Sequence, residues 1–203
     1  FTSPKMSGDA AYELIRGICN RFHELGVQAD GCTGLHVHFD AADFTWEDVV
    51  KTGIAWASYQ GVFGSMVARC RYRNSYCYPI DREKFEALKQ LASKSDLVSY
   101  VFDVRNLGQV DLTKKYTHHR YHAVNLHSWF FRQTMEFRTH HGTTNPGRIY
   151  HWAFVLGSFL EWVKKTPREE INALPFDQPD IESHARHFWR LVEAIKLPEM
   201  AVE

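Results

Sequence analysis

Residues 31–40 read GCTGLHVHFD, and two histidines, His36 and His38, lie two positions apart in this stretch. Apolar and polar residues alternate from position 35 onward, which predicts a β-strand whose successive side chains point to opposite faces. His36, His38 and Asp40 therefore share one face, and the residues between them form an apolar face suited to a core. The stretch thus predicts a strand with one ionisable face and one buried face.

A second ionisable face is predicted at residues 133–140, QTMEFRTH. Its polar side is formed by Thr134, Glu136, Arg138 and His140, opposite Met135, Phe137 and Thr139. Residues 121–127, YHAVNLH, alternate in the same way, so a β-hairpin across residues 128–132 is a candidate. A half-solvated antiparallel sheet explains either strand alone. His, Glu and Arg together on one face are more typical of a divalent metal beside a phosphate.

Helical spacing of apolar residues predicts several helices around these strands. The expected helices cover residues 9–25, 46–69, 81–91, 149–165 and 181–196. Thr45, followed three residues later by Asp48, predicts the N-cap of the second helix. Residues 96–113 are ambiguous apart from a turn at 106–108, and prolines 167, 175 and 179 indicate a loop. We expect one α+β domain over residues 1–203.

The composition narrows the classes of partner. Lys and Arg together number 24, as do Asp and Glu, so the chain has no excess charge that would attract nucleic acid or an anionic membrane. The longest apolar run, at residues 152–163, is interrupted by Gly157, Ser158 and Glu161 and is too short to span a bilayer. Four scattered cysteines without a CxxC pair predict reduced thiols in a cytoplasmic protein.

Residue types alone leave the metal open. Mg²⁺ prefers oxygen ligands. Two histidines and Glu136 would equally suit Zn²⁺ or Fe²⁺, which accept nitrogen ligands. Without further information a zinc site ranks first. A zinc- or iron-dependent hydrolase built on His36, His38 and Glu136 is therefore one hypothesis for the function.

Several motifs follow one another along the chain: TSPKMSG at 2–8, GxxGLHVH at 31–38, RNSYCYPI at 73–80, RYxAVNL at 120–126, TMEFR at 134–138 and HGTTNP at 141–146. In this order they resemble the amidoligase family of the glutamine synthetase and glutamate–cysteine ligase superfamily, whose members are carboxylate–amine ligases. The resemblance covers roughly residues 2–163 and leaves the loop and helix at 168–203 outside it.

The resemblance implies a glutamine synthetase-like catalytic domain, with helices packed on one side of a curved antiparallel sheet. The concave face of this sheet would bind ATP with Mg²⁺ or Mn²⁺. The implied reaction joins a carboxylate and an amine, on small molecules or peptides, through an acyl-phosphate intermediate. Relatives of the superfamily often assemble, so a homo-oligomer is a further expectation.

The resemblance also implies roles for individual residues. His36 and Glu136 would be metal ligands, while His38 and Arg138 would be catalytic and contact the ATP phosphates. Weaker candidates, for phosphate or substrate contacts, are Arg120, Arg71, Asn74 and Asn125.

One part of the family pattern is expected to be missing. Members carry an early Glu-x-Glu strand and a Glu shortly before an S-P motif, which is Ser3-Pro4 in this sequence. Both features would fall before Phe1, so one or more N-terminal strands of the sheet are expected to be absent. A catalytically incomplete binding or structural relative is therefore the second hypothesis, after the ligase.

Overall fold

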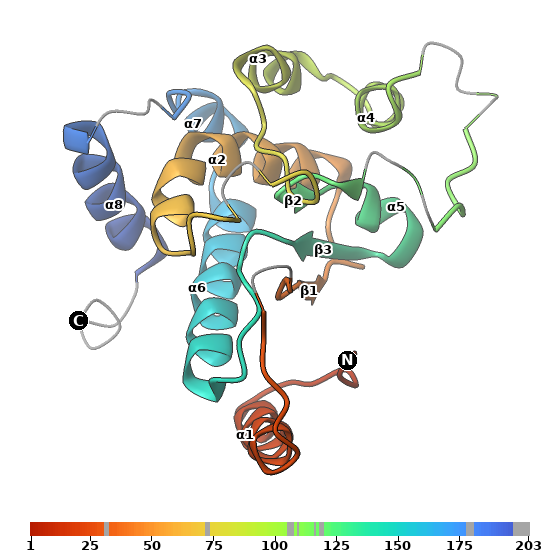
Figure 1. Ribbon diagram of the computed structural model, residues 1–203. Helices are drawn as coiled ribbons and strands as arrows, with labels where there is room; N and C mark the ends of the chain where they lie inside the picture. Colours follow the sequence, from red (N-terminus) through yellow and green to blue (C-terminus); the bar gives the residue numbers. More distant parts are fainter. Residues whose placement is uncertain are drawn as a thin grey trace.

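Three short strands and the helices around them form a mixed α+β fold in the computed structural model (Figure 1). The structure describes residues 1–30, 33–71, 74–104, 108, 110–115, 117, 120–177 and 181–196. The strands are β1 (Val37–Asp40), β2 (Val124–Asn125) and β3 (Thr134–Phe137). The helices are α1 (Asp9–Glu24), α2 (Trp46–Ser65), α3 (Arg82–Gln90), α4 (Lys94–Phe102), α5 (His127–Arg132), α6 (Pro146–Lys165), α7 (Arg168–Asn172) and α8 (Ile181–Ile195).

The sheet is antiparallel, and β3 lies between β1 and β2. Glu136 of β3 is directly opposite His38 of β1 and Asn125 of β2. Directly opposite residues of neighbouring strands share a face. The three side chains therefore lie on one face of the sheet, and the residues that alternate with them lie on the other.

The second face of the sheet packs on α2 and α6, which lie next to the strands in Figure 1. Phe137 of β3 lies 5.2 Å from the ring of Trp56 on α2 and 6.3 Å from the ring of Phe159 on α6, measured between centroids. Trp56 in turn stacks on Phe63 at 4.5 Å. All four rings are fully buried, so this aromatic group is the centre of the core.

Helix α2 contacts α3, α6, α7 and α8 and is buried along nearly its whole length. The predicted cap at its start is confirmed, because the Thr45 side chain accepts from the Asp48 N–H while Asp48 accepts from the Thr45 N–H. The helix ends at Ser65, so the predicted extension to residue 69 was wrong. Helix α1 lies beside α6 at the lower edge of the molecule (Figure 1).

Other expected elements are changed in detail. β2 and β3 pair as predicted, but α5 connects them instead of a simple loop. Helix α4 occupies part of the ambiguous region, and the short α7 occupies the proline-containing loop. Residues 106, 107 and 179 lie outside the described residues. Within the described part of the chain, no helix is long and apolar enough to cross a membrane.

Candidate active site

The polar face of the sheet is centred on the carboxylate of Glu136. One oxygen, Oε1, accepts from Arg138 Nη1 at 2.6 Å and lies 3.4 Å from both His36 Nδ1 and His38 Nε2. The other oxygen, Oε2, accepts from Asn125 Nδ2 at 2.5 Å. We call these five residues the Glu136 cluster.

Burial divides the Glu136 cluster into an inner and an outer part. Glu136, Arg138 and Asn125 are each 3% exposed. The side chains of His36 and His38 retain 34% and 36% of their accessible surface. The imidazoles are therefore the part of the cluster that a ligand can reach directly, and the charged pair is buried.

The surroundings of Glu136 keep it ionised. Burial by itself raises the pKa of this carboxyl, but the contacts of His38 and Asn125 and the charge of Arg138 outweigh burial and lower the pKa to about 2. The pKa of His36 is lowered, which favours the neutral form of its ring. Burial and the neighbouring Arg138 lower the pKa of His36 to about 4, so at neutral pH its ring has an unprotonated nitrogen.

Further contacts hold the cluster in place. His38 Nδ1 lies 3.0 Å from Thr134 Oγ1, which is 2.8 Å from Ser128 Oγ on α5. Arg138 donates from Nε to the carbonyl of Tyr76 at 3.1 Å. Both ends of the cluster are thus joined to neighbouring segments, which fixes the direction of its side chains.

Arg71 supports the cluster through the main chain. This arginine is 2% exposed, and its Nη2 donates to the carbonyl of Arg138 at 2.8 Å. A Cβ at Gly34 would lie 2.8 Å from Arg71 Nη2 and 3.1 Å from His36 Nε2. Only a glycine leaves room for these two side chains where they are.

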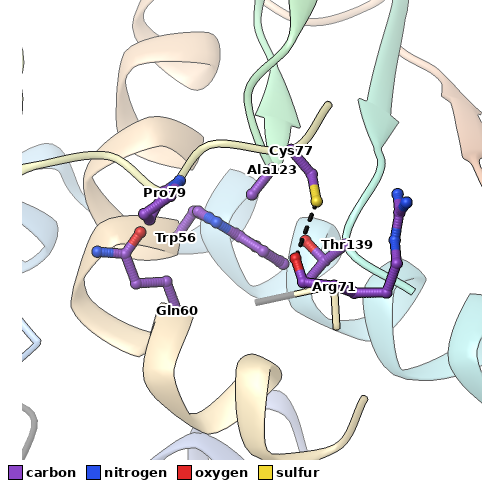
Figure 2. Close-up of a pocket in the computed structure, with 7 residues that line it drawn as sticks. All are labelled: Trp56, Gln60, Arg71, Cys77, Pro79, Ala123 and Thr139. Atoms are coloured by element: carbon purple, nitrogen blue, oxygen red, sulfur yellow. Dashed lines mark hydrogen bonds between the residues drawn. The ribbon is translucent and has the colours of Figure 1, made fainter. Parts of the chain in front are cut away.

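A small pocket lies on the core side of Arg71 (Figure 2). It is lined by Trp56, Gln60, Arg71, Cys77, Pro79, Ala123 and Thr139. Cys77 donates from Sγ to the Arg71 carbonyl at 3.0 Å, while the guanidinium of Arg71 points away from Trp56 and Gln60. None of the residues that line this pocket belongs to the Glu136 cluster.

The structure brings together five of the eight sequence-predicted site residues, namely those of the Glu136 cluster. Arg71 is adjacent, but its guanidinium bonds to main chain. Arg120 lies beyond Tyr121, with its guanidinium carbon 5.9 Å from the ring centroid. Asn74 holds a turn, because its Oδ1 accepts from the Tyr76 N–H at 2.9 Å. Substrate contacts of these three residues stay predictions.

His140 is not in the cluster, although alternation placed it on the face of Glu136. Its ring stacks on His141 at 4.3 Å and lies 5.1 Å from Trp152 of α6. The strand ends at Phe137, so alternation no longer decides where a side chain points three residues later. The role of the Tyr76 carbonyl was not predicted either, because side-chain patterns contain no signal for a main-chain acceptor.

The described residues do not by themselves fit a magnesium site. Within the described part of the chain, no group of three or more His, Cys, Asp or Glu side chains is arranged to hold a metal ion. Two imidazoles and one carboxylate are rich in nitrogen, whereas Mg²⁺ prefers oxygen ligands. In addition, Arg138 occupies the carboxylate oxygen nearest the imidazoles.

Comparison with known proteins identifies the family. The sequence model of a family described as "Putative amidoligase enzyme" matches residues 1–159 of the 203. Comparisons with curated proteins and with solved structures gave no match. The matched part contains the whole sheet and every residue of the Glu136 cluster. The chain therefore belongs to the amidoligase family, which indicates an enzyme with a ligase-type function.

Proposed function

We propose that this protein joins a carboxylate to an amine in an ATP-dependent reaction, as a glutamine synthetase-like ligase. The observation that carries the proposal is the Glu136 cluster. A buried carboxylate–guanidinium pair lies beneath two half-exposed imidazoles on one sheet face. Such a face can bind a group that is rich in negatively charged oxygens. The family match supports a ligase function for the protein that carries it.

Arg138 is the candidate for stabilising the transferred phosphoryl group. Its Nε is bound to Tyr76 and its Nη1 to Glu136, and among the described residues no hydrogen bond involves its Nη2. Arg138 is 3% exposed, so a phosphoryl oxygen would have to enter past the two imidazoles, where it would meet a donor whose orientation is already set. His38, whose side chain is partly exposed, is the candidate for contacting the remaining phosphate oxygens.

The proposed reaction has two steps. A carboxylate oxygen of the first substrate attacks the γ-phosphorus of ATP, the bond to ADP breaks, and an acyl phosphate forms. The amine nitrogen then attacks the acyl carbon, the carbon–oxygen bond to phosphate breaks, and phosphate leaves as the nitrogen loses a proton. Neither step needs a nucleophilic side chain, so the protein has to position the reactants and neutralise charge.

Mg²⁺ or Mn²⁺ belongs to the proposal as the counter-ion of ATP. The phosphate oxygens and water would be its main ligands, as is usual for Mg²⁺ with nucleotides. His36, whose ring has an unprotonated nitrogen at neutral pH, would be the side chain of the cluster able to contribute a further ligand.

The test is ADP and phosphate release from Mg²⁺-ATP, measured with a panel of amino acids and short peptides as carboxylates, each with and without ammonium or a primary amine. Release that requires both partners is expected, and chelation of the divalent ion should abolish it. Glu136→Gln removes the charge that orients Arg138 and should lower kcat/KM by roughly 100-fold or more.

The matched control is Glu161→Gln. Glu161 is an exposed glutamate of α6 whose partner is Lys165, so this variant should keep full activity. Thermal unfolding would show that both variants are folded. Undiminished turnover in folded Glu136→Gln would refute the proposed site, and the lack of any ATP turnover with the whole panel would count against the ligase itself.

A further inference from the structure

An aromatic surface borders the Glu136 cluster where residues 76–78 run beside the chain that enters β2. The Tyr78 N–H donates to the Tyr121 carbonyl, and the Ala123 N–H donates to the Tyr78 carbonyl, both at 2.8 Å. Cys77 is buried, whereas Tyr76 and Tyr78 are 57% and 50% exposed. Cys77 is thus turned inward, and the tyrosines on either side of it are turned toward solvent.

Of the two tyrosines, Tyr76 is joined to the cluster. Its ring lies edge-on to the ring of Tyr121, with 5.5 Å between centroids. The ring of Tyr121 in turn lies 5.7 Å from the guanidinium carbon of Arg138. The carbonyl of Tyr76 also accepts from Arg138 Nε. The ring of Tyr76 is therefore held at a defined place next to the group that we assign to the phosphoryl oxygens.

The exposed ring of Tyr76 is suited to binding a ligand with a flat face. The ring of Tyr76 lies at 82° to the ring of Tyr121, and Tyr76 is 57% exposed, so the residue is open to a ligand despite this contact. Uncovered aromatic rings beside a cationic groove are a common way of binding a base whose phosphates lie in that groove. Arg138 and the two partly exposed imidazoles provide the polar face for phosphate, and Tyr76 provides the ring.

We propose that Tyr76 is the stacking platform for the purine base of the nucleotide whose phosphates lie on the Glu136 cluster. This assignment rests on the proposed function, because it takes ATP as the ligand. It adds to that function the position of the base, on the side of the cluster formed by residues 76–78. Tyr78 has comparable exposure on the same segment but no ring contact with Tyr121 among the described residues, so it is the matched control.

The experiment is isothermal titration calorimetry of the full chain with two ligands, Mg²⁺-ATP and Mg²⁺-tripolyphosphate, the second of which lacks a base. Wild type is expected to bind ATP more tightly than tripolyphosphate. Tyr76→Leu should weaken ATP binding by about 5- to 100-fold, the usual contribution of one stacked base. The same variant should leave the affinity for tripolyphosphate within about twofold.

Two control variants sharpen the comparison. Tyr76→Phe keeps the ring and should bind ATP like wild type, and Tyr78→Leu should bind both ligands within about twofold of wild type. If Tyr76→Leu weakens both ligands equally, Tyr76 only holds Arg138 in place and the platform is refuted.

The ligands also separate this inference from the proposed function. If wild type binds ATP and tripolyphosphate with equal affinity, the phosphate-binding face stands and the base platform is wrong. If wild type binds neither ligand, the ATP-dependent function itself fails and the base assignment fails with it.

Discussion

At the scale of single residues, Glu136 decides the character of the polar face. Burial raises the pKa of Glu136, but its contact with His38, the charge of Arg138 and the amide of Asn125 outweigh burial and lower the pKa to about 2. A depressed carboxyl pKa stabilises the fold at pH values above the unfolded value of 4.5. That contribution is lost as the pH falls through the folded value of about 2. The charge of Glu136 is thus fully present at neutral pH.

Gly34 provides the first prediction at this scale. In Gly34→Ala the new Cβ would meet Arg71 Nη2 at 2.8 Å and His36 Nε2 at 3.1 Å, so both side chains must shift. Because Arg71 holds the carbonyl of Arg138, the cluster should lose its geometry. We expect Mg²⁺-ATP binding to weaken by about 10-fold or more, measured by calorimetry.

Gly17→Ala is the control for this substitution. A Cβ at Gly17, within α1, would meet nothing within 4 Å. This variant should bind ATP normally. Because alanine is a better helix former than glycine, the substitution should raise the free energy of unfolding by about 0.5–1 kcal/mol and thus the unfolding temperature slightly. Wild-type affinity in Gly34→Ala would show that the close contact has no role in the site.

At the scale of elements, α2 depends on the capping box at its start. Asp48 accepts from the Thr45 N–H at 2.9 Å through Oδ2 and lies 3.0 Å from Lys51 Nζ through Oδ1. Lys51 also donates to the carbonyls of Lys164 and Thr166. Through Lys51, Asp48 therefore connects the first turn of α2 with the end of α6. These are the two helices that pack against the apolar face of the sheet.

A pH-dependent stability follows from Asp48. Burial raises the pKa of this carboxyl, but the hydrogen bonds of Thr45 and Lys51 outweigh burial, and the pKa lies below 3.8. The ionised form thus stabilises the fold above pH 3.8, and this contribution is lost as the pH falls through the lower folded pKa. Asp48→Asn should lower the free energy of unfolding by about 1–2 kcal/mol at neutral pH, with a smaller difference from wild type in acid.

Urea unfolding of both proteins between about pH 7 and pH 3 measures this difference. Asp43→Asn is the control, because Asp43 also pairs with a lysine, Lys164, but its side chain is 70% exposed. An exposed pair should contribute less than about 1 kcal/mol. If the difference between wild type and Asp48→Asn did not shrink toward low pH, the charge of Asp48 would not be its source.

At the scale of the whole molecule, the sheet separates the reactive groups from the core. Phe137 packs into the aromatic group of Trp56, Phe63 and Phe159, while its neighbour Glu136 faces the other side. Any loss of this packing should therefore release β3, which carries Glu136 and leads directly into Arg138.

Two phenylalanines of α6 test this dependence. Phe159 is fully buried and lies 5.3 Å from Phe63 and 6.2 Å from Trp56, between ring centroids. Phe159→Ala should cost about 3–5 kcal/mol of the free energy of unfolding. Phe154 is 39% exposed on the same helix, and Phe154→Ala should cost less than about 1 kcal/mol. Urea denaturation of the two variants measures both values, and similar costs would contradict the proposed core.

Local patterns in the sequence predicted much of this protein. Alternation at 35–40 and 134–138 predicted which side chains share a face, because a strand repeats every two residues whatever it packs against. Thr45 and Asp48 predicted the start of α2, since a cap uses groups only three residues apart. The shorter α4 and α7 were missed, because such short segments have a weak helical pattern and are stabilised largely by packing.

The way in which these strand faces combine depends on contacts between distant parts of the chain. Alternation along the sequence predicted that His36 and His38 share one polar strand face and that Glu136 and Arg138 share another. It did not determine that β3 lies between β1 and β2, so that Glu136 meets both His38 and Asn125. That order and register come from burying Phe137 against α2 and α6, which are distant in the chain. Local geometry is fixed by the backbone, whereas contacts between distant segments depend on which arrangement buries the most apolar surface.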